Sequence, residues 1–528
     1  MGDENNKKIK KQLEEKKDEK IVDLANLVFF NWVKNIREVV KQKKPNDKKL
    51  QNIAALLIMI FSLSLLFYLI DLKIPAIPKI IIITFLLVIS GEILIGLKNL
   101  EGEFGLIFFK DKKIIEFIDK IAQKYKNIFI FLAESGFILG YGLAGIFLLN
   151  RKEKWKTKII FGLLIFFIFI NLILPYTQLA LSGSIRDEEL TLASKYLKEQ
   201  NIYEYRIEFY LFGNKISIDF ATIFYILTNL FGVAGAVFFS ISLYSLFIVS
   251  SFLIKIFEFF LAIVGKSITS TPLPPAGGTI LLPGKNLPLL EGIIAFVVIL
   301  IVHELAHGIL ARIYQIKLKS SGIVLFGVLP VGAFVEPDEE QMLKIEKEKQ
   351  NKILVAGSTS NLYVGLLSFL LILLIMSVTT PYRLDGYYYY DGEKYTKINT
   401  INGILPQEFF SKNKNFSFNQ TIKLEMENGK NEVIEGQNID KIKRYYKEWY
   451  KFVYKYTDGM EIVEFILNTL RLTFSLNVIV GCINLLFIPF FDGNRIIKNS
   501  IENKKLADLI IIINSAAFLL NLLPWLFK

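Results

Sequence analysis

The sequence predicts a polytopic α-helical membrane protein, and three observations support this fold class. Of its 528 residues, 52% are hydrophobic, and the mean hydropathy is positive at +0.42. Apolar segments of about 20 residues recur along the chain, and each is long enough to cross a bilayer. The net charge of +12 comes mainly from lysines in the N-terminal tail and between these segments, so we expect them to set membrane orientation.

Composition also excludes some classes of protein and site. Nucleic-acid binding is excluded because no basic and aromatic fold module accompanies the charge. The single cysteine, Cys482, lies in an apolar run, so we expect neither an internal disulfide nor a cysteine-based zinc site. We also expect no cleavable signal peptide, since the N-terminal region is highly charged and lacks an early apolar stretch.

The first half of the chain is predicted to form two parts. Residues 1–51 are a cytosolic basic tail in which 21–40 have near-helical apolar spacing, which favours an amphipathic helix on the membrane surface or a partner-binding arm. Residues 52–265 form an accessory multi-span membrane domain without a histidine or another evident ligand set. Its apolar segments lie at about 52–71, 76–97, 128–149, 158–176 and 218–265, the last of which suits two helices or one extended helix.

The stretch at 289–313, LLEGIIAFVVILIVHELAHGILARI, reads as a spanning helix with the only two histidines of the chain. His303 and His307 lie four positions apart, so a helix places both imidazoles on one face, where they can bind one metal ion. HExxH is a zinc protease signature in which the glutamate, here Glu304, is the general base. The position of the motif within the span predicts a metal in the hydrocarbon zone and a substrate that is itself in the membrane.

Residues 266–377 are predicted to form the first part of a catalytic membrane core around this helix. The segment 266–288 is dense in proline and glycine, so it is expected to be a structured loop. The sequence SGIVLFGVLPVGAFV at 321–335 is β-prone and broken by glycine and proline, which predicts short re-entrant strands. Such strands must be shielded by protein or pair with another strand, and an extended edge beside the metal would hold a peptide straight for cleavage.

Two later segments complete this core. The span at 353–377 begins with Gly357 and Asn361, which we attribute to helix packing. The charged segment before this span is expected to be cytosolic. Residues 461–528 form the second part of the core, with one span that ends in NLLFIPFFDG and one final span.

Residues 378–460 are predicted to form a small soluble α+β insert. KINTINGILPQEFF indicates a strand, an Asn-Gly turn at Asn402 and a helix, and TIKLEME and NEVI pair across a second Asn-Gly turn at Asn428. The basic and aromatic segment 441–456 indicates an interfacial helix that leads back to the membrane.

Two histidines leave a catalytic zinc ion short of one protein ligand, because such sites commonly have three. Asp492 is the first candidate, since it follows a charge-free run and a helix break at Pro489, on the same membrane side as His307. Glu336 is the rival, because zinc proteases of the glutamate class take their third ligand from downstream of HExxH. The residues alone leave both candidates open.

HELAHG, GVLPVGAFVEPDEEQ, the 357–361 segment and NLLFIPFFDG together resemble the site-2 protease family of intramembrane zinc metalloproteases, which is peptidase family M50, in its archaeal-like branch. The resemblance covers about residues 270–528. Phe491 stands where the family usually has leucine, and Phe487 where it often has proline. Both keep the site apolar, and neither removes a ligand.

The resemblance implies a set of site residues and a domain type. The implied zinc ligands are His303, His307 and Asp492, with one zinc ion per site. Glu304 is then the catalytic base, and Asn484 contacts the substrate backbone. The fold class implied is a site-2-protease-like transmembrane core with short re-entrant β segments, and the soluble insert corresponds to a degenerate PDZ-like domain.

We therefore expect a zinc metalloendopeptidase that cuts transmembrane protein substrates within or near the bilayer, as in regulated intramembrane proteolysis. The alternatives are a gluzincin-type protease that cuts at the interface and a metal-binding transporter or scaffold. Lysine-rich segments at 314–352 and 492–506 predict a multi-pass protein of the cell membrane with its N-terminus and active-site side in the cytosol, and with residues 378–460 extracytoplasmic. The expected partners are substrates and the lipid bilayer, and the sequence leaves open whether another protease must cut first.

Overall fold

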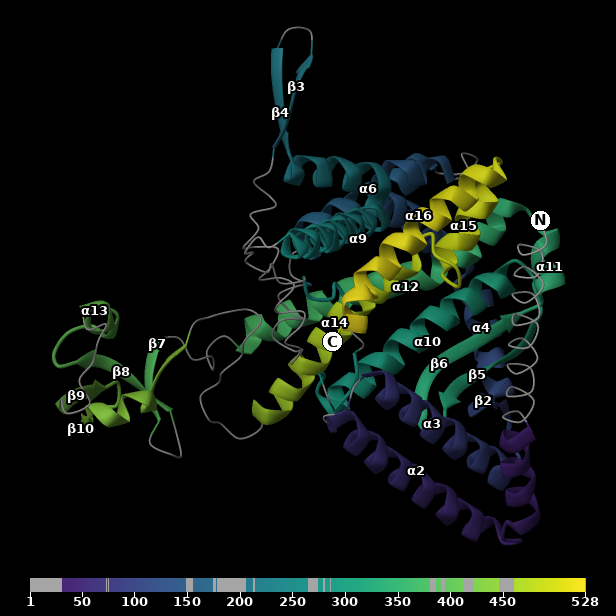
Figure 1. Ribbon diagram of the computed structural model, residues 1–528, viewed down its shortest axis with the longest axis horizontal. Helices are drawn as coiled ribbons and strands as arrows, with labels where there is room; N and C mark the ends of the chain where they lie inside the picture. Colours follow the sequence, from purple (N-terminus) through teal and green to yellow (C-terminus); the bar gives the residue numbers. More distant parts are fainter. Residues whose placement is uncertain are drawn as a thin grey trace.

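A computed structural model gives the structure of the protein (Figure 1). The structure describes residues 31–72, 74, 76–148, 155–173, 177, 206–211, 214–264, 274–278, 281–284, 286–379, 386–390, 395–412, 421–445 and 460–527. Three predictions therefore lie wholly or partly outside the described residues: the start of the N-terminal tail, much of the 266–288 loop, and most of the interfacial helix before the last part of the core.

Eight helices among the described residues are long and apolar enough to cross a membrane, which agrees with the predicted polytopic α-helical class. They are α2 (Lys48–Asp71), α3 (Ala76–Lys98), α5 (Lys126–Tyr141), α9 (Phe220–Ile263), α10 (Leu289–Ile313), α12 (Lys347–Thr379), α14 (Met460–Asn484) and α16 (Lys504–Leu522). The segment predicted at 158–176 is also helical, as α6 (Trp155–Ile168) and a π-helical turn (Phe169–Ile173), but it is not one of the eight.

A buried ion pair connects the N-terminal segment to the hairpin of α2 and α3. Residues 31–43 are helical, and the Arg37 guanidinium donates two hydrogen bonds to the Glu92 carboxylate in α3, at 2.7 and 3.1 Å. Glu92 is completely buried and also accepts a hydrogen bond from the backbone N–H of Gly105 at 3.0 Å. The bond to Glu92 outweighs desolvation and raises the pKa of Arg37. Residues 31–43 are therefore packed against α3.

The long apolar tract at 218–265 forms two helical arms that meet at a break. Within α9, Gly232 has φ 66° and ψ −157°, a conformation that glycine adopts without steric cost. The glycine-rich segment at 128–149 also divides, into α5 and a 3₁₀ helix (Gly142–Leu148). α9 packs against both of these and against α16, so the predicted accessory segment lies beside the last span of the core.

Helices α10, α12 and α14 pack against one another at the centre of the helical core (Figure 1). α12 begins at Lys347, before the predicted start of the span at residue 353. The buried charge of Lys352 can lie within this helix because it is paired with two carboxylates. Its Nζ atom lies 2.7 Å from the carboxylate of Glu134 in α5 and 2.7 Å from that of Glu348, one turn earlier in α12. Glu134 also pairs with Lys158 of α6. The end of the charged segment that we expected before the span is thus part of the helix.

The predicted re-entrant segment forms paired strands, as its buried backbone requires. The strands are β1 (Glu101–Glu103), β2 (Leu106–Lys110), β5 (Leu318–Phe326) and β6 (Leu329–Pro337). They form one antiparallel sheet in the order β1-β2-β5-β6, so β5 pairs with a strand from the first half of the chain. β6 is the edge strand and packs along α10, as does α4 (Lys112–Lys124), which an ion pair between Asp119 and Arg312 fastens to α10.

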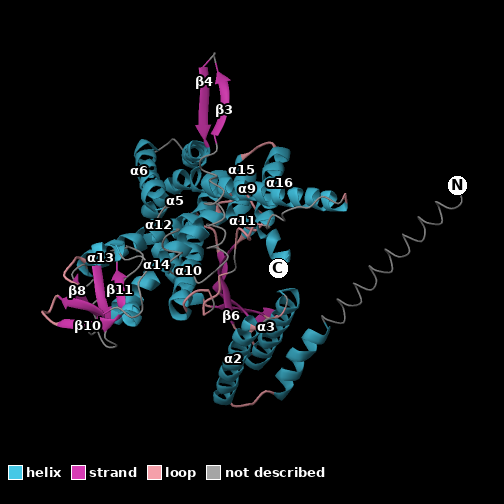
Figure 2. Ribbon diagram, turned by 60° about the vertical axis from the view of Figure 1, so that its left-hand side comes forward, coloured by secondary structure: helices cyan, strands magenta, loops and turns pink. Residues whose placement is uncertain are grey.

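The soluble insert is a five-stranded antiparallel sheet in the order β10-β9-β8-β7-β11 with one short helix (Figure 2). Its elements are β7 (Gly386–Tyr390), β8 (Tyr395–Ile401), α13 (Pro406–Lys412), β9 (Thr421–Met426), β10 (Asn431–Glu435), a 3₁₀ helix (Gly436–Lys441) and β11 (Ile442–Tyr445). The predicted order of strands and both Asn-Gly turns are confirmed. That the insert is PDZ-like stays a prediction.

The prediction of an interfacial helix from residue 441 onward is wrong at its start. Ile442–Tyr445 forms β11, because these residues pair with the tyrosine-rich strand β7 and bury Ile442. Elements that the sequence analysis did not anticipate include β1, β2, α4 and β7. They also include the hairpin β3 (Arg206–Leu211) and β4 (Asn214–Asp219), α11 (Glu339–Lys344), α15 (Asp492–Ser500) and a 3₁₀ helix at Leu523–Phe527.

The buried charges between α5, α6 and α12 lead to a stability prediction. Replacing Glu134 with leucine leaves the buried Lys352 and its neighbour Lys158 without their shared carboxylate, and breaking a buried pair typically costs about 3–5 kcal/mol. Lys352→Met should cost less, since Glu134 then keeps Lys158. Thermal unfolding of the purified protein in detergent measures both, and an equal or smaller loss for Glu134→Leu would contradict the shared role of this carboxylate.

Candidate metal centre

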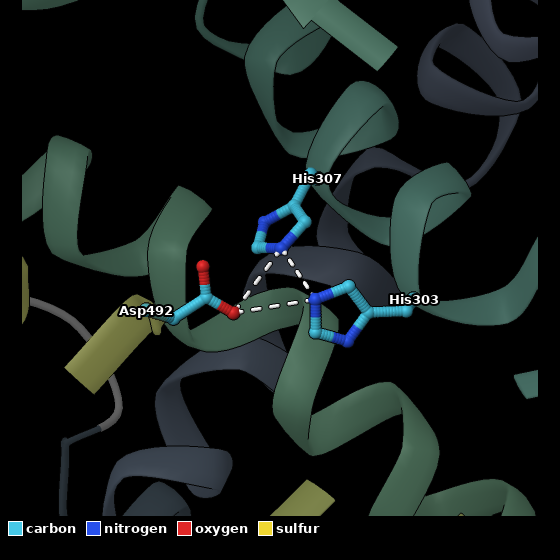
Figure 3. Close-up of side chains that lie close together, drawn as sticks. All are labelled: His303, His307 and Asp492. Carbon is cyan, nitrogen blue, oxygen red and sulfur yellow. Dashed lines mark hydrogen bonds and ion pairs between the residues drawn. The ribbon is translucent and has the colours of Figure 1, made fainter. Parts of the chain in front are cut away.

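The structure brings His303, His307 and Asp492 together from two segments far apart in the chain (Figure 3). The two histidines lie one turn apart on α10, and Asp492 is the first residue of α15, directly after the irregular stretch that follows α14. The Nε2 atoms of the histidines are 3.1 Å apart, and each is 3.3 Å from Oδ2 of Asp492. Among the described residues this is the one cluster of three such ligand groups.

The spacing of these three atoms fits a zinc ion. Zinc takes nitrogen and oxygen ligands at about 2.0–2.2 Å in a tetrahedral arrangement, which places the ligand atoms about 3.3 Å from each other. The observed triangle has sides of 3.1, 3.3 and 3.3 Å. Burial by itself would raise the pKa of Asp492, whereas protonated imidazoles lower it, and a bound cation would in the same way favour the ionised carboxylate that a ligand must be.

A backbone carbonyl in α12 sets the orientation of the first imidazole. Nδ1 of His307 lies 2.7 Å from the carbonyl oxygen of Ile353, to which an Nδ1–H can donate. Nε2 then keeps its lone pair and faces Asp492. Metal-binding histidines usually have this kind of partner on the other ring nitrogen, because it fixes both the tautomer and the ring plane.

The side chain of Asn361 performs the same role for the second imidazole. It lies 3.3 Å from Nδ1 of His303, through the atom assigned as Nδ2, while its Oδ1 is buried without a hydrogen-bond partner. The oxygen and nitrogen of an asparagine amide are nearly indistinguishable in shape, so the hydrogen-bond network decides which of them faces His303. The exchanged orientation lets Nδ1–H of His303 donate to Oδ1, which frees Nε2 for a metal.

Gly357 provides the space in which the imidazoles lie. A Cβ atom at this position would be 2.2 Å from Nε2 of His307 and 2.8 Å from Cε1 of His303. No side chain larger than hydrogen fits there without moving the rings. Gly357 and Asn361 therefore contact the histidines directly, and general helix packing, our prediction for them, describes only part of their role.

Glu304 lies on the same helix as both histidines and is partly accessible. Its Oε2 atom accepts a hydrogen bond from the backbone N–H of Val335 in β6 at 3.0 Å, which fixes the carboxylate beside the edge of the sheet. Glu336, the rival third ligand, is not in the cluster. Its carboxylate instead accepts a hydrogen bond from Ser320 of β5 at 2.5 Å, its direct partner in the strand register.

The loop that carries Asp492 is held by a residue of the first half. The hydroxyl of Tyr141 in α5 donates to the carbonyl oxygen of Leu485 at 3.2 Å, and its ring stacks on Phe487 with centroids 5.8 Å apart. Phe487 is one of the two departures from the family pattern, so the stacking explains how an aromatic residue is accommodated. Asn484 is the last residue of α14, partly exposed at the start of this loop, and its contact with substrate stays a prediction.

Sequence reasoning missed several residues that support the site. The carbonyl of Ile353 carries no sequence signal, because every residue has one. In the sequence, Tyr141 is one aromatic residue of an apolar segment, and it lies more than a hundred residues before the HELAH helix. Asn361 did give a signal, since an amide inside a spanning segment is expensive and is usually functional.

The fold and the site together define a multi-pass membrane protein with a candidate metal site among its helices. Comparison with known proteins agrees with this class. The model of Peptidase family M50 matches residues 291–523, just under half of the chain, so this part is similar to that family of membrane metallopeptidases, which includes the site-2 proteases. The match covers α10 to α16 and all three residues of the cluster.

The chain is also similar to an uncharacterized protein of the archaeon Methanocaldococcus jannaschii. The two are 42% identical over 113 residues, which is 21% of this chain and 30% of that protein. The alignment thus spans about a third of the length of the relative. No solved structure matches the chain significantly.

The contact between Asn361 and His303 predicts how zinc affinity responds to substitution. Asn361→Leu should weaken zinc binding about 10–100-fold, because the ring loses the partner that holds its tautomer. Asn361→Asp should stay close to the wild type, since a carboxylate can accept the Nδ1–H bond. Zinc affinity, measured by competition with a chromophoric chelator, checks this, and Asn477→Leu is a control for the loss of a buried amide elsewhere.

The opposite ranking would overturn the assigned orientation of the amide. If Asn361 donates to Nδ1, an aspartate, which has no donor when ionised, should be as harmful as leucine. If all variants match the wild type, Asn361 only packs the helices.

Proposed function

We propose that this protein is an intramembrane zinc metalloprotease that hydrolyses peptide bonds within or near the transmembrane segments of membrane proteins. The observation that carries the proposal is the triangle of His303 and His307 on the candidate span α10 with Asp492 at the start of α15, and Glu304 directly follows His303 on α10. A zinc ion held there would supply a Lewis acid that polarises the scissile carbonyl and lowers the pKa of water.

Glu304 acts as the general base and acid of this reaction. It takes a proton from the attacking water and passes it to the leaving amine, a role that typically contributes 10²–10⁴-fold in rate. The hydrogen bond from the Val335 N–H holds one carboxylate oxygen of Glu304 and leaves the other oxygen to accept the proton. The apolar surroundings exclude bulk water and strengthen these electrostatic effects.

The free edge of β6 is suited to hold the substrate in an extended form. In an antiparallel pair, successive residues alternate in pointing their N–H and C=O toward and away from the partner strand. The N–H of Val335 points away from β5, to Glu304, so Ala333 presents its own N–H and C=O along the same edge. A substrate helix that unwinds locally can pair there, next to the general base.

The remaining expectations about substrate and membrane orientation are part of the same proposal. Asn484, at the start of the Asp492 loop, contacts the substrate backbone. The protein lies in the cell membrane with the lysine-rich segments near the site in the cytosol and the insert on the other side. Its partners are transmembrane protein substrates and the bilayer, with another protease acting upstream where substrates need a first cut.

The first test is cleavage of single-span model substrates in liposomes by zinc-loaded protein. Glu304→Gln should lower the rate by about 10²–10⁴-fold with its zinc content unchanged, because the amide cannot take a proton. Glu291→Gln, on the first turn of the same helix, is the matched control and should cut normally. Retained cleavage by zinc-replete Glu304→Gln protein would refute the role of this residue.

A second test separates the two candidate third ligands. Asp492→Asn should lose most of its bound zinc at equal chelator concentration, because the cluster then has two strong ligands instead of three. Glu336→Gln should keep its zinc, since this side chain bonds Ser320. Elemental analysis of the zinc content of both variants distinguishes the two ligands. Loss of zinc from Glu336→Gln but not from Asp492→Asn would favour the gluzincin-type enzyme that cuts at the interface.

A further inference from the structure

A separate cavity of about 300 Å³ lies beside the general base. It is enclosed by α10, α4 and the strands β5 and β6, which lie along one another in Figure 1. Glu304 is part of its wall. Lys113 and Ser321 are the other polar residues of the wall. The rest of the wall is mostly apolar, with side chains that include Ile114, Phe117, Ile301, Leu305, Ile323 and Phe334.

Helical spacing explains why these side chains meet in one place. Ile301, Glu304 and Leu305 occupy positions i, i+3 and i+4 of α10, so they share one face. Ile114 and Phe117 are likewise three residues apart on α4, and the ion pair of Asp119 with Arg312 holds that helix against α10. The general base and an apolar wall are thus presented to the same space.

The free edge of β6 forms another border of this cavity. Ala333 and Val335 line it, and they are the residues whose backbone groups point away from β5. Side chains of a strand that pairs with this edge alternate between the two faces of the sheet. One side chain beside the scissile bond is therefore directed toward the space between α4 and α10.

We propose that this cavity is a specificity pocket for one apolar side chain of the substrate next to the scissile bond. The inference rests on the proposed function and adds a substrate preference to it. At about 300 Å³ the cavity is at the lower limit of pockets that hold small ligands, so it accepts one leucine, methionine or phenylalanine side chain. A substrate carboxylate would lose its hydration in this largely apolar space and would lie beside Glu304, with Lys113 as the one basic residue of the wall, so apolar side chains are preferred.

The test is a set of single-span substrates, reconstituted in liposomes, that differ only at residues flanking one mapped cleavage site. Wild-type protein should prefer leucine, methionine or phenylalanine over glycine, alanine and aspartate at one flanking position. Ala333→Leu, which fills the cavity, should lower the phenylalanine-to-alanine rate ratio about tenfold or more. Ile301→Ala, which enlarges it, should shift the preference toward larger side chains.

The controls separate this inference from the proposed function. Ile294→Ala removes the same atoms from an exposed position on α10 outside the cavity wall and should leave the profile unchanged. Zinc content shows that each variant is folded. Cleavage with a flat profile that neither cavity variant alters would overturn the pocket and leave the protease intact. Failure of the wild type to cut any substrate would overturn the proposed function, and the pocket with it.

Discussion

The cost of placing polar groups among apolar helices governs this structure. An unpaired polar group in the hydrocarbon region costs several kcal/mol, so each part of the metal centre needs a partner. His307 has the carbonyl of Ile353, His303 has the amide of Asn361, and both face the carboxylate of Asp492. The hydrogen bonds that offset the cost of burying these polar groups also fix the ring tautomers that a metal requires.

α12 is the element on which these contacts converge. It supplies the carbonyl, the amide and the empty space at Gly357, although it carries none of the three cluster residues. Its own position is set by α5, through the Lys352–Glu134 pair and a hydrogen bond of 2.6 Å between Ser135 and Tyr363. A helix from the first half of the chain therefore supports the geometry of the site.

The four-stranded sheet beside Glu304 shows the same dependence on distant segments. β5 and β6 follow the HELAH helix directly, but β5 completes its hydrogen bonds with β2, about two hundred residues earlier in the chain. This pairing satisfies one side of the hairpin and leaves β6 as the edge nearest Glu304. The position of β2 thus decides which strand is free to meet a substrate.

The sequence by itself determined the features that local pattern and residue chemistry encode. Hydropathy located six of the eight spans closely and placed the last two within 461–528, although the segment at 158–176 is not one of the eight. The HELAH spacing gave the two imidazoles, and Asn-Gly turns placed the insert hairpin. Asp492 could be proposed as third ligand because a single charge after a long apolar run is conspicuous, but Glu336 remained its rival.

Only the tertiary structure decided which residues surround these groups. It united Asp492 with the histidines, assigned Glu336 to Ser320, and brought Tyr141 to the loop and β2 to the sheet. It also showed a strand where the basic and aromatic run at Ile442–Tyr445 suggested a helix. The physical reason is that such contacts join residues far apart in the chain through ordinary carbonyls, amides and rings, which no local pattern distinguishes.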